Sequence, residues 1–87
     1  MDPTAISRWL ETVMSAPNVD GALLIEASSG ICLGAAGKAT EDDATFLTVA
    51  SRSALDTDGV GAVAYKDSRV LLRKGEAGVL VAVFIGM

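Results

Sequence analysis

Apolar residues recur at helical spacing over residues 40–56, TEDDATFLTVASRSALD. At about 100° per residue, this stretch carries two apolar stripes side by side. The first consists of Ala44, Leu47, Ala54 and Leu55, and the second of Phe46, Val49 and Ala50. The clearly polar strip is limited to Thr45, Thr48, Arg52 and Asp56. A surface helix of a monomer normally has one apolar stripe and a broad solvated face, so the second stripe predicts a partner molecule.

A shorter helix is predicted at the N-terminus, ending at Ser15. Asp2 or Thr4 can cap it, and Pro3 suits its first turn. Its apolar positions recur at helical spacing and are Ile6, Trp9, Leu10, Val13 and Met14. Trp9 is interpreted as a core residue in preference to an interface anchor.

The remaining apolar runs are short and bounded by turn residues, which favours strands. A first pair is predicted to form a hairpin, and three more strands follow the long helix. Their predicted bounds are residues 19–27, 31–36, 62–66, 69–74 and 79–85, with turns at Asp67 and Ser68 and at residues 75–78.

The order helix, two strands, helix, three strands predicts one α/β (α+β) domain over residues 1–87, with helices packed on a five-stranded, largely antiparallel sheet. The last strand, VLVAVFI, is apolar at every position, as expected of a central strand covered on both faces. The long helix can cover one face and the first helix part of the other. Because no helix follows before Met87, a second apolar surface is expected on that other face.

Composition strengthens the expectation of a complex. Hydrophobic residues make up 51% of the chain and charged residues 21%, which predicts a folded domain with an unusually apolar surface. The net charge of −4 lacks the basic footprint of a nucleic-acid-binding protein. Arg69, Arg73 and Lys74 are interpreted as solvent-facing strand residues in preference to a site for an acidic partner.

Candidate chemistry is sparse, and no enzymatic activity, cofactor or metal is predicted. The chain has no histidine, which excludes Ser-His-Asp triads and imidazole zinc sites. Cys32, the one cysteine, is expected to be packed inside a strand, and it favours a reducing compartment. The loop GAAGKAT has the wrong spacing for a phosphate-binding loop. The acids Glu41, Asp42 and Asp43 are interpreted as a solvated helix start, with the Thr40 hydroxyl accepting the amide of Asp43.

The sequence gives no sign of membrane targeting. The start MDPTAISRWL lacks the basic region and apolar run of a signal peptide and the glycine needed for myristoylation. The most apolar stretch, residues 78–86, is about half the length of a membrane span.

Over nearly its full length the chain resembles the Roadblock/dynein light chain family, and more closely the small Ragulator subunits of the LAMTOR family. The resemblance rests on three segments together with the order of elements. They are LETVMSAPNVDGALLIEASSGICLG, GKATEDDA and LLRKGEAGVLVAV.

The resemblance implies a non-catalytic scaffold subunit that pairs with another Roadblock-type protein through the long helix and the edge strand after it. It also implies a lipidated scaffold subunit that anchors the complex, a location on the lysosome, late endosome or vacuole, and recruitment of Rag-type GTPases for amino-acid signalling to the TOR kinase. Carried over by position, the interface is Phe46, Val49, Ala50 and Ser53 with Ala62, Val63, Ala64, Tyr65 and Lys66. Two alternatives remain open: a homodimeric Roadblock regulator of a small GTPase, and a dynein-associated light chain.

Overall fold

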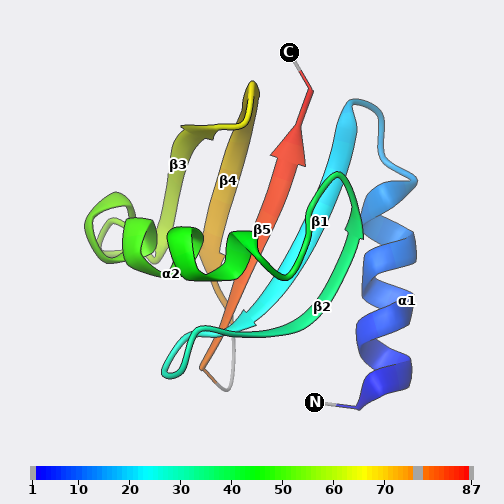
Figure 1. The fold of residues 1–87 in the computed structure, drawn as a ribbon, viewed down its shortest axis with the longest axis horizontal. Helices are drawn as coiled ribbons and strands as arrows, with labels where there is room; N and C mark the ends of the chain where they lie inside the picture. Colours follow the sequence, from blue (N-terminus) through cyan, green and yellow to red (C-terminus); the bar gives the residue numbers. More distant parts are fainter. Residues whose placement is uncertain (1, 76–77, 87) are drawn as a thin grey trace.

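A computed structural model of the chain describes residues 2–75 and 78–86. Two helices and five strands occur in these residues in the predicted order (Figure 1). They are α1 (Pro3–Met14), β1 (Val19–Glu26), β2 (Ile31–Gly37), α2 (Asp43–Ala54), β3 (Val60–Tyr65), β4 (Ser68–Lys74) and β5 (Val79–Ile85). Asp2, one of the two predicted candidates, caps α1, since its carboxylate accepts the amide of Thr4 at 2.9 Å.

Three predicted boundaries are wrong in ways that matter below. Helix α2 begins at Asp43, three residues after its predicted start. Strand β3 begins at Val60, two residues before its own predicted start. Lys66 lies in the β3–β4 turn and not in the strand. Lys66 and Asp67 both have positive φ, 51° and 59°, as the two central residues of a mirror-image hairpin turn require. The predicted turn at residues 75–78 includes residues 76 and 77, which lie outside the described residues.

The strands form one sheet in the order β2-β1-β5-β4-β3, and every neighbouring pair is antiparallel. Strand β5 is therefore central, as its continuous apolar sequence predicts. Strands β2 and β3 are the two edges, and β3 follows α2 directly in the chain.

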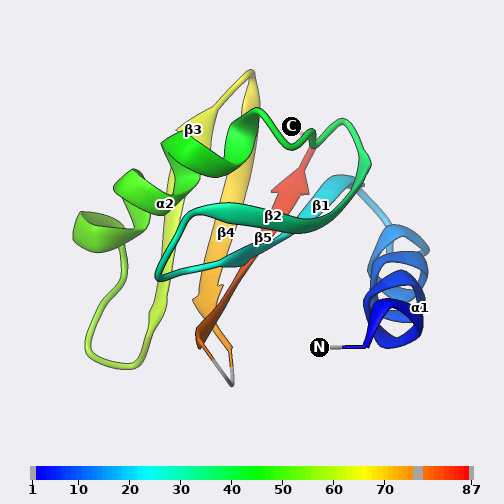
Figure 2. The same cartoon turned by 60° about the horizontal axis from the view of Figure 1, so that its bottom comes forward.

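The two helices pack on opposite faces of the sheet (Figures 1 and 2). Leu47 of α2 joins the larger buried cluster, which includes Leu23 of β1 and Phe84 of β5. Ile6 of α1 joins a smaller cluster on the other face, together with Leu24 of β1. Leu24 follows Leu23 directly, and successive side chains of a strand point to opposite faces of the sheet. Trp9 packs against this smaller cluster, in agreement with its predicted core role.

Gly61 allows β3 to pass close to the end of α2. A Cβ atom on Gly61 would collide with the carbonyl group of Ala54, the last residue of the helix. Because that obstacle is backbone, a side chain here could not be accommodated by a rotamer change. The glycine thus sets the short distance between the helix and the edge strand.

Candidate protein-docking surface

The predicted core stripe of α2 faces the sheet, and the second stripe faces outward. Ala44 and Leu47 are buried. Phe46 and Val49 keep 46% and 58% of their surface exposed, and neighbouring exposed apolar side chains of this kind indicate an interaction site. Ala50 is half-buried. The helix therefore has an unpartnered apolar side next to β3.

The predicted polar strip of α2 is wrong at Thr48, which is buried. Its hydroxyl donates to the carbonyl of Ala44 at 2.7 Å, and the hydroxyl of Ser51 donates to the carbonyl of Thr48 at 2.7 Å. Because both hydroxyl groups are satisfied within the helix, the side chains can face the core at little cost. The truly exposed polar positions on α2 include Thr45, Arg52 and Ser53.

Phe46 and Tyr65 join the exposed stripe to the edge strand. Their rings stack with centroids 4.4 Å apart and an interplanar angle of 11°, within the usual range for aromatic pairs. The Tyr65 ring also forms a T-shaped pair with the buried ring of Phe84, with centroids 6.2 Å apart. The predicted interface residues Phe46 and Tyr65 are therefore brought together by the fold.

The side chains of Ala62 and Ala64 lie on the opposite face of the sheet from Phe46. Both are exposed, whereas Val63 and Tyr65 between and beyond them pack toward the cluster under α2. Ala62 and Ala64 can therefore take part in the predicted interface through their backbone, but not through side-chain contact with the α2 stripe.

The outer backbone groups of β3 are available for another strand. The amide of Lys74 donates to the carbonyl of Gly59 at 2.8 Å, so bonded and non-bonded pairs alternate from that point. With the register of the β3–β4 pair, Val63 bonds to β4, while Ala62 and Ala64 direct their N–H and C=O groups to the free edge. β3, VGAVAY, also lacks the charged side chains and proline that commonly protect an exposed edge.

Asp43 contradicts the prediction of a solvated acidic helix start, because its side chain is fully buried. One carboxylate oxygen accepts the Tyr65 hydroxyl at 2.8 Å and the Lys66 ammonium at 2.6 Å. The other accepts the Thr40 amide at 2.9 Å and the Thr40 hydroxyl at 3.4 Å. Thr40 therefore donates to Asp43, the reverse of the predicted cap. Glu41 and Asp42 are exposed as predicted.

The pKa values follow from this arrangement. Burial favours the neutral form of Asp43, but the hydrogen bonds from Lys66, Thr40 and Tyr65 outweigh it and hold the pKa of the carboxyl below its usual range. The hydrogen bond to Asp43 raises the pKa of the Tyr65 hydroxyl and that of the Lys66 ammonium. The cluster is therefore an ion pair with a neutral tyrosine at physiological pH.

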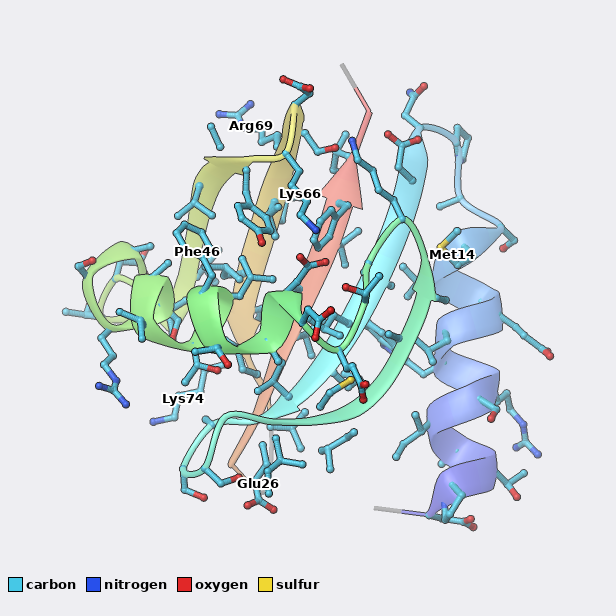
Figure 3. The ribbon with its side chains drawn as sticks, in the orientation of Figure 1. Met14, Glu26, Phe46, Lys66, Arg69 and Lys74 are labelled. Atoms are coloured by element: carbon cyan, nitrogen blue, oxygen red, sulfur yellow. The ribbon has the colours of Figure 1, made fainter. Side chains whose placement is uncertain are left out.

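Lys38 reinforces the same corner of the molecule from the segment before α2. Its ammonium group donates to the carbonyl of Lys66 at 2.6 Å and to the hydroxyl of Ser68 at 2.9 Å. Ser68 is 1% exposed, so this contact fastens the β3–β4 turn to the chain that leads into α2. Figure 3 shows Phe46 and Lys66 along the same side of the helix.

A second apolar surface lies on the face of β3, β4 and β5 that α1 leaves uncovered. Ala62, Leu71 and Val83 occupy adjacent positions across the three strands, and Leu71 is 44% exposed. Arg69 and Arg73 flank Leu71 on the same face, as their alternation predicts. Trp9 of α1, Leu71 and Val83 line a shallow hollow on this face.

Candidate sites for small ligands are few. Cys32 is half-buried in β2 and packs against the larger cluster, and burial raises the pKa of its thiol. No group of three or more potential metal ligands occurs within residues 2–75 and 78–86. Neither of the two helices that the structure describes is long and apolar enough to cross a membrane.

Comparison with known proteins identifies a family and a similar fold. The sequence model of the family described as "Ragulator complex protein LAMTOR5" matches residues 2–84. The fold is similar to the crystal structure of a Roadblock/LC7 domain from Streptomyces avermitilis, with a TM-score of 0.66, 16% sequence identity, and coverage of 90% of this chain and 76% of that one. The search of curated protein sequences gave no match.

Proposed function

Because the chain belongs to the Ragulator complex protein LAMTOR5 family, and so to a family of subunits of a larger complex, we propose that it is a non-catalytic scaffold subunit. In this proposal it pairs with another Roadblock-type protein through α2 and β3. The observation that carries the proposal is the stack of Phe46 on Tyr65, which makes an exposed helix stripe continuous with an unprotected sheet edge.

Pairing at this surface would use two kinds of contact. A partner strand beside β3 would bond to the outward backbone groups of Ala62 and Ala64 and extend the sheet. A partner helix beside α2 would cover Phe46 and Val49, while Ala50 and Ser53 are small enough to admit large side chains from it. Apolar area removed from water contributes about 25 cal/mol per Å², so the helix stripe supplies affinity and the strand supplies register.

The uncovered face of β3, β4 and β5 is proposed to receive the lipidated scaffold subunit. Its apolar centre at Leu71 and Val83 suits an apolar stripe, and Arg69 and Arg73 at its borders suit carboxylates on the same partner segment. The scaffold subunit would supply the membrane anchor at the cytoplasmic face of the lysosome, late endosome or vacuole. Recruitment of Rag-type GTPases for TOR signalling would then be an activity of the assembled complex.

The test is co-expression of the tagged chain with each Roadblock-type protein of its own organism, followed by sedimentation of the purified products. A stable one-to-one heterodimer is expected with at least one of them. Phe46→Asp should abolish it, because an isolated carboxylate would be buried against the partner, while the helical circular dichroism of the isolated chain stays unchanged. Thr45→Asp, at the neighbouring exposed position, is the matched control and should still pair.

Three other outcomes would contradict the proposal. A monomer that pairs with no Roadblock-type chain would overturn it. A tight homodimer that accelerates nucleotide hydrolysis by a small GTPase would favour the homodimeric regulator, and specific recovery of dynein in place of Rag-type GTPases would favour a dynein-associated light chain.

A further inference from the structure

The orientation of Phe46 depends on Tyr65, because the two rings are stacked. One face of its ring lies on the Tyr65 ring at 4.4 Å, and nearly half of the side chain remains exposed. Phe46 extends from a helix and Tyr65 from a strand. Any rotation of the Tyr65 ring would therefore remove the support beneath Phe46.

Two contacts fix the Tyr65 ring. The edge-on contact with Phe84 limits its position, and the hydrogen bond from its hydroxyl to Asp43 limits its rotation. Asp43 is itself immobilised, since it is fully buried and also accepts the amide of Thr40 and the ammonium of Lys66. The chain of contacts runs from a buried carboxylate to an exposed aromatic face.

We propose that Asp43 and Tyr65 are positioning residues of the docking surface. The hydrogen bond between them holds Phe46 in the orientation that a Roadblock-type partner binds. The inference rests on the proposed function. Ordering a side chain on binding opposes association, so a Phe46 ring that is already held in place binds more tightly than one that must be ordered by the partner.

The hydroxyl group can be removed without removing the ring. Tyr65→Phe keeps the contacts with Phe46 and Phe84 but deletes the bond to Asp43. The carboxylate then still accepts from Thr40 and Lys66, so this variant should fold. The effect on affinity can thus be separated from loss of the aromatic surface itself.

The experiment measures Kd for the Roadblock-type chain identified by co-expression, using isothermal titration calorimetry and four proteins: wild type, Tyr65→Phe, Phe46→Ala and the double variant. Tyr65→Phe should raise Kd about tenfold on its own, within the range of coupling found for residues in contact. In the Phe46→Ala background it should raise Kd less than about twofold, because there is no ring left to position.

Thr48→Val is the control for a general loss of stability. It removes a hydroxyl from the core side of α2, away from Phe46, and should leave Kd unchanged even where it lowers the unfolding temperature. A Tyr65→Phe effect that is equal in both backgrounds, or absent from the wild-type background, would overturn the positioning role while leaving the proposed heterodimer intact. Failure of the wild-type chain to pair at all would instead overturn the proposed function, and this inference with it.

Discussion

The hydroxyl of Tyr65, at the end of β3, donates a 2.8 Å hydrogen bond to Asp43, whose fully buried carboxylate lies in the first turn of α2. The helix and the edge strand are therefore connected by a polar contact as well as by apolar packing. Polar contacts of this kind are directional, so this one fixes how the two halves of the docking surface are oriented. Loss of this hydrogen bond should change the stability of the chain and the way in which that stability depends on pH.

Asp43→Ala should lower the free energy of unfolding by about 2–3 kcal/mol, because the Tyr65 hydroxyl and the Thr40 amide lose a charged acceptor. Urea unfolding followed by circular dichroism measures this loss. Asp42→Ala is the matched control: Asp42 is exposed and its side chain makes no capping bond, so its effect should stay within about 0.5 kcal/mol. Equal losses for the two variants would contradict the role of Asp43.

Stability should decrease in acid through the same carboxyl. The pKa of Asp43 is lower in the folded chain than the value of about 3.9 for an unfolded aspartate. Its contribution is therefore complete above about pH 5 and is lost as the pH falls through the folded-state pKa. Urea midpoints measured from neutral pH down to about pH 2.5 should fall more steeply for wild type than for Asp43→Asn, which cannot titrate at this position. Parallel curves would show that other carboxyl groups account for the acid sensitivity.

Proline substitutions can test the direction of the backbone groups in β3. Ala62→Pro removes an N–H that points to the free edge, so the fold should survive while heterodimer formation fails. Val63→Pro removes an N–H that bonds to β4 and should destabilise the isolated chain by about 3 kcal/mol. Thermal melts of the two monomers, together with sedimentation in the presence of the partner, distinguish the effects. If Ala62→Pro were less stable than Val63→Pro, the N–H of Ala62 and not that of Val63 would be the one that bonds to β4.

Gly61→Ala tests the close approach of β3 to α2. Its Cβ would collide with the carbonyl of Ala54, so the helix end must move away from the strand, at a cost of about 1–3 kcal/mol. In a domain of this size the unfolding temperature should fall by about 4–8 °C for each kcal/mol lost. Ala64→Ser, at an exposed position on the other side of the same strand, serves as the control and should leave the melt nearly unchanged.

The sequence predicts the fold well because its signals are local. Alternating or continuous apolar runs and the turn residues between them indicate the strands, and VLVAVFI indicates a central one. The burial of Asp43 is not predictable in this way. Three acids at a helix start have a sufficient local explanation. Only the fold brings Tyr65 and Lys66, more than twenty residues later, to Asp43 at the start of α2.

The error at Thr48 has a related cause. Helical periodicity ranks positions by side-chain polarity. A threonine whose hydroxyl donates to the carbonyl four residues earlier already has a hydrogen-bond partner and does not need water. The exposed stripe of Phe46 and Val49, by contrast, was predictable from periodicity alone. The apolar excess on α2 was therefore visible in the sequence, whereas the burial of Thr48 depends on a hydrogen bond that polarity alone does not indicate.

The central place of β5 affects how the chain reaches its native state. The β1–β2 and β3–β4 hairpins are each made of neighbouring residues, but within the sheet they are joined only through the strand that the ribosome makes after both. The pairing of Val19 with Ile85 and of Glu26 with Val79 closes long segments, which slows folding. Until β5 has been made, β1 and β4 therefore each lack the strand that pairs with them in the sheet. A chain interrupted before Val79 would contain both hairpins without the strand that joins them into one sheet.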